Sequence, residues 1–466
     1  MDSFEGSQII LQVHSNAHRS FSESKSIRGD KTMKPLITDR IKGSLLGWVV
    51  GDALAVPVHW YYSPARMRAD YGDIDSMITP LPTHPESMVQ GMSYTGTIDI
   101  MHDKAKHYQG NAISDAILSK EKEESLRDDH GNFVGVAQEE RVHYHKSLSK
   151  GQNTANLCLG RLAVRYLANV NKGGADGYDP DGFLSEFYNY MTTPPPSTPD
   201  PAQLIAHNDT YLDVYLRGMF AKASQKDDHS LHDCALSQRE TWSIGSLDGV
   251  VMTLPILVAY CREPESYVTG RAIEHHMLTH RSVTVTAVVS VLVPLLLDLF
   301  RGADLRSTLD EAMLKMRPPK ITGREQRDSY LQFKGPGHIP KLEKWKQHMV
   351  LADETIKDLV HRMLDCEDED VAGWGDRDHS RLSTACYCEH AFTVVLYLAY
   401  KYADNPKKAL LQNVKLGGHS TARGAILGAI LGAAHGSESV PFVQDLAAPD
   451  VVEQEIDALI GTICEV

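Results

Sequence analysis

His59 lies among residues that could bind and activate a substrate. It follows Pro57 by two positions and directly precedes Trp60 and two tyrosines. The pKa of a histidine side chain lies near neutral pH, so His59 could act as a general base or a general acid. Trp60 could stack on a base or a ribose, although aromatic residues in such a place are more often part of the core. The alternative that His59 only hydrogen-bonds to neighbouring backbone groups stays open.

A carboxylate at position 389 is a second candidate for activating water. Glu389 stands next to Cys386, Tyr387 and Cys388, just before an apolar segment with helical spacing. A glutamate in the first turn of a helix is also common for electrostatic reasons alone, because it faces the positive end of the helix dipole. We interpret the two cysteines as buried thiols rather than as a reactive pair.

Two glycine-containing segments come directly before predicted helices and could hold a ligand. The first consists of Gly417, Gly418, His419 and Ser420. Free N–H groups at the positive end of a helix favour an anion, so we predict that this segment binds a diphosphate. Arg423 follows one turn later and could assist. The second segment, residues 151–154, includes Gln152 and Asn153, and its amides could hold ribose hydroxyls.

The densest groups of histidines are His143 with His145, and His275 with His276 and His280. In an extended segment residues 143 and 145 share a face, and in a helix residues 276 and 280 share one. Either pair could ligate zinc or iron. Because the chain has 22 histidines, some clustering by chance is expected, and a structural role is favoured for each pair taken alone.

Glycine recurs at four-residue spacing in two predicted helices, at positions 43, 47 and 51 and at positions 424, 428, 432 and 436. A glycine inside a helix costs ~1 kcal/mol relative to alanine, so several in register require a reason. The spacing places them in a stripe that lets another backbone approach closely. We predict that both helices also present their ends, near Asp52 and His419, to one site. Asp52 itself is expected to cap a helix or hold the loop.

Apolar residues recur at helical spacing along most of the chain, and period-two alternation is nearly absent. The helical segments are residues 154–167, 185–191, 211–223, 246–259, 267–276, 391–402 and 451–463. The predicted fold class is therefore all-α, with no internal repeat of 20–50 residues. Residues 1–36 are expected to form a flexible extension, and proline-rich surface loops are expected near residues 192–202 and 317–344.

Composition and charge exclude several classes of protein. Hydrophobic residues make up 42% of the chain and charged residues 23%, which excludes a collagenous or wholly disordered protein. The formal charge of −14 disfavours nucleic acid as a main partner and a polybasic membrane anchor. Seven cysteines, an odd number and mostly far apart in the sequence, favour reduced thiols and a cytoplasmic location. The apolar stretch 283–300 falls short of the ~20 apolar residues of a membrane-spanning helix, so we predict a buried core helix and no membrane partner.

The two glycine-rich segments resemble motifs of the ADP-ribosylglycohydrolase superfamily. Residues 41–60, IKGSLLGWVVGDALAVPVHW, resemble its opening helix and GDALG-x-P-x-E loop. Residues 416–436, LGGHSTARGAILGAILGAAHG, resemble its closing GGD-x-DT…GA-x-x-G helix. Weaker internal motifs match in the right order at Ser243-Ile244-Gly245 and at Leu278-Thr279-His280. The resemblance covers about residues 37–440 and implies a single large orthogonal helical-bundle domain over residues 37–466.

Some motifs are closer to a divergent branch of that superfamily, which resembles the J-type crystallins and selenoprotein J. These motifs are His59-Trp60-Tyr61-Tyr62, Cys386-Tyr387 and Arg423-Gly424. What the superfamily resemblance implies is an ADP-ribose crevice at helix ends, in which carboxylates hold two magnesium ions and the glycosidic bond at the ribose is hydrolysed. Substrate-binding positions would then include Trp60, Asn153, Ser243, Gly245, His280, Gly417, Gly418, Ser420 and Arg423.

The sequence departs from the family pattern at the metal positions. The family's T-D-D-T element aligns with residues 151–154 and its GGD-x-DT element with residues 418–422, and neither segment keeps a carboxylate. The ligand positions are occupied by Gln152, Asn153, His419 and Thr421, and His59 replaces the acidic residue of the first loop. Magnesium prefers oxygen ligands that include carboxylates, and two divalent cations without them would repel each other. We expect no pair of magnesium ions, and one weakly held ion bridged by substrate phosphates stays open.

Two functions are therefore in competition. The first is an enzyme that hydrolyses a glycosidic bond at the ribose of ADP-ribose, of a related nucleotide-sugar or of an ADP-ribosylated protein, with His59 or Glu389 activating water. The alternative is a catalytically inactive ADP-ribose-binding or crystallin-like structural protein. The missing carboxylates favour the alternative, whereas the polar residues that remain favour the enzyme, namely Asn153, Ser243, His280 and Ser420. A hydrolase with a histidine-bound transition metal is a third and weaker hypothesis.

Overall fold

The computed structural model describes residues 33–87, 141, 143–172, 176–193, 196–198, 200–213, 215–216, 219–220, 233, 245–319, 354–373 and 380–464. Its α-helices are α1 (Met33–Ala55), α2 (Pro64–Tyr71), α6 (Ala155–Val170), α7 (Pro180–Thr192), α10 (Asp248–Val251), α11 (Leu254–Ala259), α12 (Glu265–His276), α13 (Val283–Phe300), α14 (Leu305–Leu314), α17 (Ile356–Met363), α18 (Asp368–Val371), α19 (Cys388–Lys401), α20 (Pro406–Leu416), α21 (Ser420–His435) and α22 (Pro449–Cys464). Short 3₁₀ turns are η1 (Val56–Val58), η6 (Ser437–Ser439) and η7 (Val443–Asp445). Within these residues the strands are β1 (Ala372–Gly373) and β2 (Leu382–Ser383), which pair in parallel. The fold class is all-α, as predicted.

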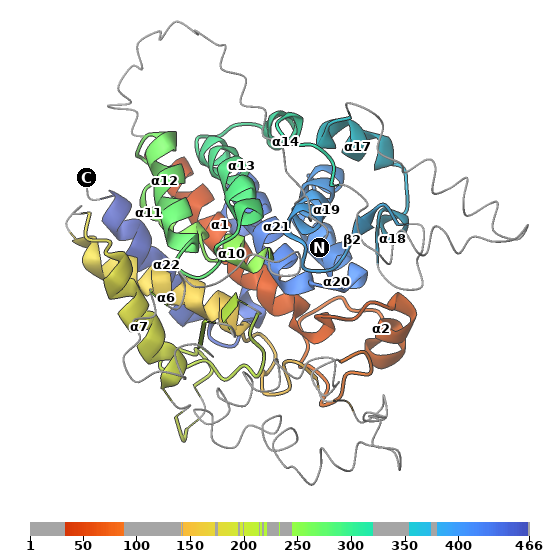
Figure 1. Cartoon of the computed structure of the whole chain (residues 1–466), viewed down its shortest axis with the longest axis horizontal. Coiled ribbons are helices and arrows are strands. Elements are labelled where there is room, and N and C mark those ends of the chain that lie inside the picture. The colour runs from red at the N-terminus through yellow and green to blue at the C-terminus, as the bar shows by residue number, and fades with distance from the viewer. Residues whose placement is uncertain are drawn as a thin grey trace, which may run out of the picture.

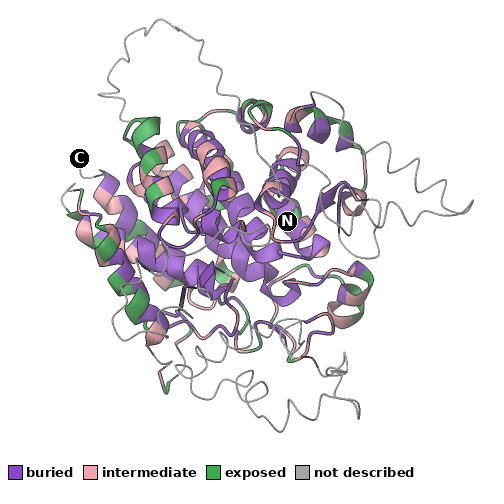
Figure 2. Ribbon diagram, in the orientation of Figure 1, coloured by how far each residue is buried: buried purple, intermediate pink, exposed green. Residues whose placement is uncertain are grey.

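Helices α1 and α21 form the centre of the molecule and pack antiparallel against each other (Figure 1). A Cβ atom added to Gly47 would lie 2.1 Å from the carbonyl oxygen of Gly428, and one added to Gly51 would lie 1.9 Å from that of Gly424. The glycine stripes therefore face each other and allow backbone-to-backbone contact, which confirms the predicted packing. Every described side chain of α21 from Ser420 to Ala433 is buried (Figure 2).

The remaining helices cover this central pair. Helices α6 and α22 pack against each other and α22 also contacts α1, while α19 and α20 cover α21. Helix α13 contacts both central helices and is itself packed against α12 (Figure 1). This arrangement makes one hydrophobic core, and it brings the C-terminal end of α1 beside the N-terminal end of α21.

Most predicted helices are present, with three differences. Helix α1 begins at Met33, so residues 33–36 belong to the helix rather than to the extension. The segment 246–259 is divided into α10 and α11, because the ring of Pro255 would clash with the preceding turn of a continuous helix. The predicted helix 211–223, the loop 317–344 and the extension lie largely outside the described residues.

Two helical segments are long and apolar enough to cross a membrane by length and composition alone, Ile37–Val58 and Val283–Phe300. Within the molecule 94% of the first and 67% of the second are buried against other parts of the chain. Such burial is typical of core helices in a folded domain. Helix α13 thus has the boundaries of the predicted core helix 283–300.

Candidate functional site

The loop after α1 and the loop before α21 are paired through their backbones. The N–H of Trp60 donates to the carbonyl of Gly418 at 2.7 Å, and the N–H of Gly418 donates to the carbonyl of Tyr61 at 2.6 Å. The φ angles of Trp60, Gly417 and Gly418 are positive, at 71°, 61° and 61°. A Cβ atom at Gly418 would lie 2.2 Å from the carbonyl oxygen of Thr384, so this position requires glycine. The predicted meeting of the two helix ends is confirmed.

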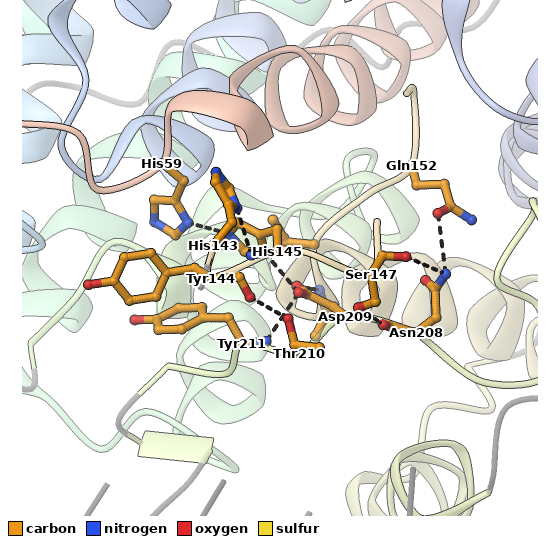
Figure 3. Close-up of polar contacts among 12 residues, drawn as sticks. His59, His143, Tyr144, His145, Ser147, Gln152, Asn208, Asp209, Thr210 and Tyr211 are labelled. Carbon is orange, nitrogen blue, oxygen red and sulfur yellow. Dashed lines mark hydrogen bonds and ion pairs between the residues drawn. The ribbon is translucent and has the colours of Figure 1, made fainter. Parts of the chain in front are cut away.

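A chain of hydrogen bonds leads to His59 from a buried carboxylate (Figure 3). Oδ1 of Asp209 lies 2.8 Å from Nδ1 of His145, and Nε2 of His145 lies 2.6 Å from Nδ1 of His59. A carboxylate only accepts, so Nδ1 of His145 carries the proton and its Nε2 accepts a proton from His59. This tautomer assignment leaves Nε2 of His59 with a free lone pair, as a general base requires.

Backbone donors hold Asp209 in place. The N–H of Ala155, the first residue of α6, donates to Oδ2 at 2.9 Å, and the N–H of Tyr211 donates to Oδ1 at 3.1 Å. The segments 143–147 and 208–211 lie side by side, and the hydroxyl of Thr210 donates to the carbonyl of Tyr144 (Figure 3). The start of α6 also places the positive end of a helix dipole next to the carboxylate of Asp209.

His59 is neutral at physiological pH. Burial lowers the pKa of His59 well below its usual value, and the neighbouring histidines, His145 first among them, lower it further. The side chain is 2% exposed, and Nε2 has no hydrogen-bond partner among the described residues. A neutral imidazole with an open nitrogen can accept a proton from water or a hydroxyl group.

Two other histidines nearby have structural roles. His84 donates to the carbonyl of His59 at 3.1 Å, and His143 donates to the carbonyl of Pro57 at 2.9 Å. The second ring nitrogen of each accepts a backbone N–H two residues along the chain. Burial lowers the pKa of His84 to about 3. Both rings therefore brace the loop that carries His59.

His419 lies against a second buried carboxylate. Its Nε2 is 3.0 Å from Oδ2 of Asp248, an ion-pair contact without the alignment of a hydrogen bond. Asn156 donates to Oδ1 of Asp248 at 2.8 Å, and the hydroxyl of Ser246 donates to Oδ2 at 3.0 Å. Burial alone would raise the pKa of Asp248, but the attraction to His419 outweighs it and lowers the pKa to about 2. The ionised carboxylate of Asp248 therefore lies directly against the ring of His419.

The rings of His59, Trp60 and His419 form a compact stack. Their centroids are 4.8 Å apart for His59 and Trp60, 5.0 Å for Trp60 and His419, and 5.1 Å for His59 and His419. Interplanar angles are 22°, 15° and 27° in the same order. Trp60 is half-buried, so the stack reaches the surface at this residue. The ring of Tyr211, which is also half-buried, packs edge-on against Trp60 there.

Asp52 holds the loop that precedes α6. It accepts hydrogen bonds from Nδ2 of Asn153 at 3.0 Å, the N–H of Thr154 at 2.9 Å and the hydroxyl of Thr154 at 2.7 Å. Burial raises the pKa of Asp52 to about 6, against the effect of these donors. The predicted holding role fits this geometry.

The residues at the family's metal positions do not fit two magnesium ions. The amide oxygen of Gln152 already accepts the N–H of Ser149 at 2.9 Å, and the amide of Asn153 donates to Val49 and Asp52. His419 offers nitrogen, and Thr421 offers a hydroxyl at the start of α21. Across the described ranges, no group of three or more His, Cys, Asp or Glu side chains is arranged to hold a metal ion.

The predicted diphosphate cradle is wrong in two respects. The amides of the four residues from 417 to 420 all donate inside the protein, to the carbonyls of Val414, Tyr61, Thr384 and Gly418 respectively. Arg423 is fully buried and donates to Asn413, Thr384 and Gly417. Burial lowers its pKa to about 9. Arg423 therefore holds the loop in shape and has no nitrogen left for a phosphate.

The other predicted positions lie around this centre. His280 is buried, with Nε2 3.0 Å from Asp213 and Nδ1 2.8 Å from the hydroxyl of Thr279, so both nitrogens are occupied. The carbonyl of Gly245 accepts the N–H of Cys388, which places it at the start of α19 next to Glu389. Glu389 is half-buried. Ser420 binds the carbonyl of Ala55 through its hydroxyl at 3.2 Å. The predicted position Ser243 lies outside the described residues.

Sequence reasoning missed both carboxylates of the site. Asp209 and Asp248 are far in the sequence from His59 and His419, and neither belongs to a motif quoted above. The clustering of histidines points to His145, but it favours a structural role for this residue. A signal was present, because Asp209 follows His207 and Asn208 in a polar segment, which is typical of a ligand-binding loop.

The family to which the chain belongs is shown by its sequence. The sequence model of the family described as ADP-ribosylglycohydrolase matches residues 33–465. A solved structure described as an ADP-ribosylglycohydrolase-related protein complex is similar at a TM-score of 0.47 and 14% identity, over 92% of this chain and 99% of that chain. A comparison with curated proteins found no match. The family match extends over nearly the whole chain, and the chain therefore belongs to the ADP-ribosylglycohydrolase family.

Proposed function

We propose that this protein hydrolyses a glycosidic bond at the ribose of ADP-ribose or a related nucleotide-sugar, without a pair of magnesium ions. The observation that carries the proposal is the chain from Asp209 through His145 to His59, which ends on a buried nitrogen that has no hydrogen-bond partner among the residues that the structure describes. Family membership supports glycosidic-bond hydrolysis as the reaction class. ADP-ribosylated proteins in the cytoplasm are the proposed substrates.

His59 acts as the general base. Its Nε2 takes a proton from a water molecule, and the water oxygen forms a bond to C1″ of the ribose as the bond to the leaving group breaks. The positive charge on His59 is shared with His145 through the 2.6 Å hydrogen bond and balanced by Asp209. The proton is then returned to the leaving group, which restores the neutral histidine. Glu389, half-buried at the start of α19, is the second candidate for positioning the water.

A binding protein that has lost catalysis is the second candidate. The observation in its favour is the side chains at the metal positions, because Gln152 and Asn153 are engaged in loop contacts and His419 faces Asp248. In this case the protein would bind ADP-ribose, or serve a structural role of the kind found in crystallins.

Release of ADP-ribose in the presence of EDTA separates these candidates. Peptides that carry ADP-ribose on arginine or on serine are incubated with the wild-type protein, with His59→Gln and with His361→Gln. His361 is a matched control, since it is a surface histidine that pairs with Asp310. We expect release by the wild type and by His361→Gln, and a loss of about 100-fold or more in His59→Gln. If the protein binds ADP-ribose but releases none from any peptide, the enzyme is excluded and the second candidate, a binding protein, is supported.

A further inference from the structure

The carboxylate of Asp248 lies buried among polar side chains, at 3% exposure. Nδ2 of Asn156 donates to its Oδ1 at 2.8 Å, and the hydroxyl of Ser246 donates to its Oδ2 at 3.0 Å. Nε2 of His419 lies 3.0 Å from the same Oδ2. A buried carboxylate is costly unless donors or a positive charge compensate for the lost water. Of these three side chains, only the imidazole can carry a positive charge.

The ring of His419 fills the place next to this carboxylate. The side chain is 0% exposed, and its ring centroid lies 5.0 Å from that of Trp60 and 5.1 Å from that of His59. The aligned GGD-x-DT element of the family has a carboxylate where this chain has His419. The substitution replaces oxygen ligands, which hard cations such as Mg²⁺ prefer, by a ring that itself contacts the neighbouring carboxylate.

We propose that the side chain of His419 takes the place of a metal ion against Asp248, so that the native site needs and binds no divalent cation. The imidazole supplies from within the protein the compensation that a bound cation would supply from solution. The inference rests on the proposed function, which uses no pair of magnesium ions, and adds to it the side chain that replaces the metal.

A carboxylate at position 419 should therefore create a cation site. An aspartate side chain is smaller than a histidine ring, so the substitution His419→Asp opens space beside Asp248. The amide oxygen of Asn156 is buried and has no hydrogen-bond partner in the described ranges, and it belongs to the amide group that already contacts Asp248. Two carboxylates and one amide oxygen form a set of ligands that Mg²⁺ and Mn²⁺ accept.

Titration of the metal-free full-length protein with Mn²⁺ tests the proposal, with the free ion followed by electron paramagnetic resonance. The samples are the wild type, His419→Asp and His361→Asp. The last is a matched control, because Nε2 of His361 lies 2.7 Å from a carboxylate oxygen of Asp310 at the surface. Both substitutions thus replace a histidine by an aspartate beside an existing carboxylate.

We expect His419→Asp to bind one Mn²⁺ at least about tenfold more tightly than the wild type and His361→Asp do. Mn²⁺ at about 100 times the dissociation constant should raise the melting temperature of His419→Asp by about 3 °C. Binding of Mn²⁺ or Mg²⁺ by the wild type as tightly as by His419→Asp would overturn the proposal. Equal binding by the two aspartate variants would overturn it as well.

A second pair of variants tests the proposal without any metal, and decides it if His419→Asp does not fold. His419→Asn removes the ring and adds no carboxylate, so the buried charge of Asp248 loses its compensation and the melting temperature should fall by about 3–5 °C. Adding Asp248→Asn removes that charge, so the double variant should recover most of the loss. A double variant that melts no higher than His419→Asn would refute the proposed compensation.

This inference and the proposed function can fail separately. A wild type that binds no divalent cation and releases no ADP-ribose would refute the proposed function alone. A wild type that binds Mn²⁺ as tightly as His419→Asp does, yet releases ADP-ribose in EDTA, would refute this inference alone.

Discussion

The indole ring of Trp60 stacks on the imidazole ring of His419, with centroids 5.0 Å apart and an interplanar angle of 15°. The two residues belong to loops at opposite ends of the described chain, one after α1 and one before α21. Their contact depends on the antiparallel packing of these helices and on the backbone pairing of Trp60 with Gly418. The geometry of the candidate site is therefore coupled to a glycine contact in the core.

Substituting a glycine of this contact should damage both the core and the site. In Gly47→Ala the new Cβ would lie 2.1 Å from the carbonyl oxygen of Gly428, so the helices must separate. We expect a loss of about 3 kcal/mol in the free energy of unfolding, measured by urea denaturation, because backbone cannot move aside as a side chain can.

Gly270→Ala is the matched control for this substitution. Gly270 is exposed in α12, and no atom lies within 4 Å of an added Cβ. Alanine should stabilise this helix by up to about 1 kcal/mol. Equal stability of the two variants would show that the close approach of α1 and α21 is not present in solution.

The sequence allowed prediction of the features that depend on local spacing. The glycine stripes predicted the α1–α21 contact, and the length and composition of residues 283–300 predicted α13. The start of the first helix was predicted less well, because α1 begins at Met33, inside the predicted extension, and Asp39 within this helix accepts a hydrogen bond from the N–H of Ser437.

The hydrogen-bonding state of the site could not be read from the sequence. Nothing local indicates that Arg423 points to Asn413 and Thr384, or that the amide of His419 is already bound by Thr384. The partnership of His419 with Asp248 joins residues from different helices, and no spacing rule connects them. A sequence motif can place a residue at a site, but its free donors and acceptors depend on the packed neighbours.

Asp209→Asn should impair catalysis with little effect on binding. An asparagine can present its NH₂ group to Nδ1 of His145, which would reverse the tautomer and remove the acceptor for His59. We expect the rate of ADP-ribose release to fall by about 10²- to 10⁴-fold while the affinity for ADP-ribose changes little. The measurement is a single-turnover assay beside a calorimetric titration. An unchanged rate would exclude His59 as a base supported by this chain.

Acidification below about pH 6.5 should destabilise the protein through its buried histidines. Burial lowers the pKa of His275 and His84 to about 3 and that of His276 to about 4. Unfolded histidines bind protons below their ordinary pKa of about 6.5 and the folded ones do not, so stability is lost as pH falls from that value. Below about pH 6.5, each such histidine lowers the free energy of unfolding by about 1.4 kcal/mol per pH unit.

One carboxylate opposes this trend. Burial raises the pKa of Asp52 to about 6, so on acidification Asp52 takes up its proton at a higher pH in the folded protein than in the unfolded chain. Protonation of this one group therefore stabilises the folded state as the pH falls. We still expect unfolding to take up a net number of about two protons or more, measured from urea midpoints between about pH 7 and about pH 5. His275→Gln should reduce the uptake by about one. A constant midpoint over this range would contradict the burial of the histidines.

Cys386 should resist alkylation although it is half-buried near the candidate site. Burial raises the pKa of its thiol to about 12, and the charge of Asp248 adds to the shift. At about pH 8 almost none of it is thiolate, which is the reactive form. Iodoacetamide treatment of the native protein, followed by mass spectrometry, should leave Cys386 and the buried Cys158 unmodified, whereas both react in urea. Rapid labelling of native Cys386 would instead identify a reactive thiolate, and a covalent mechanism would then replace activation of water by His59.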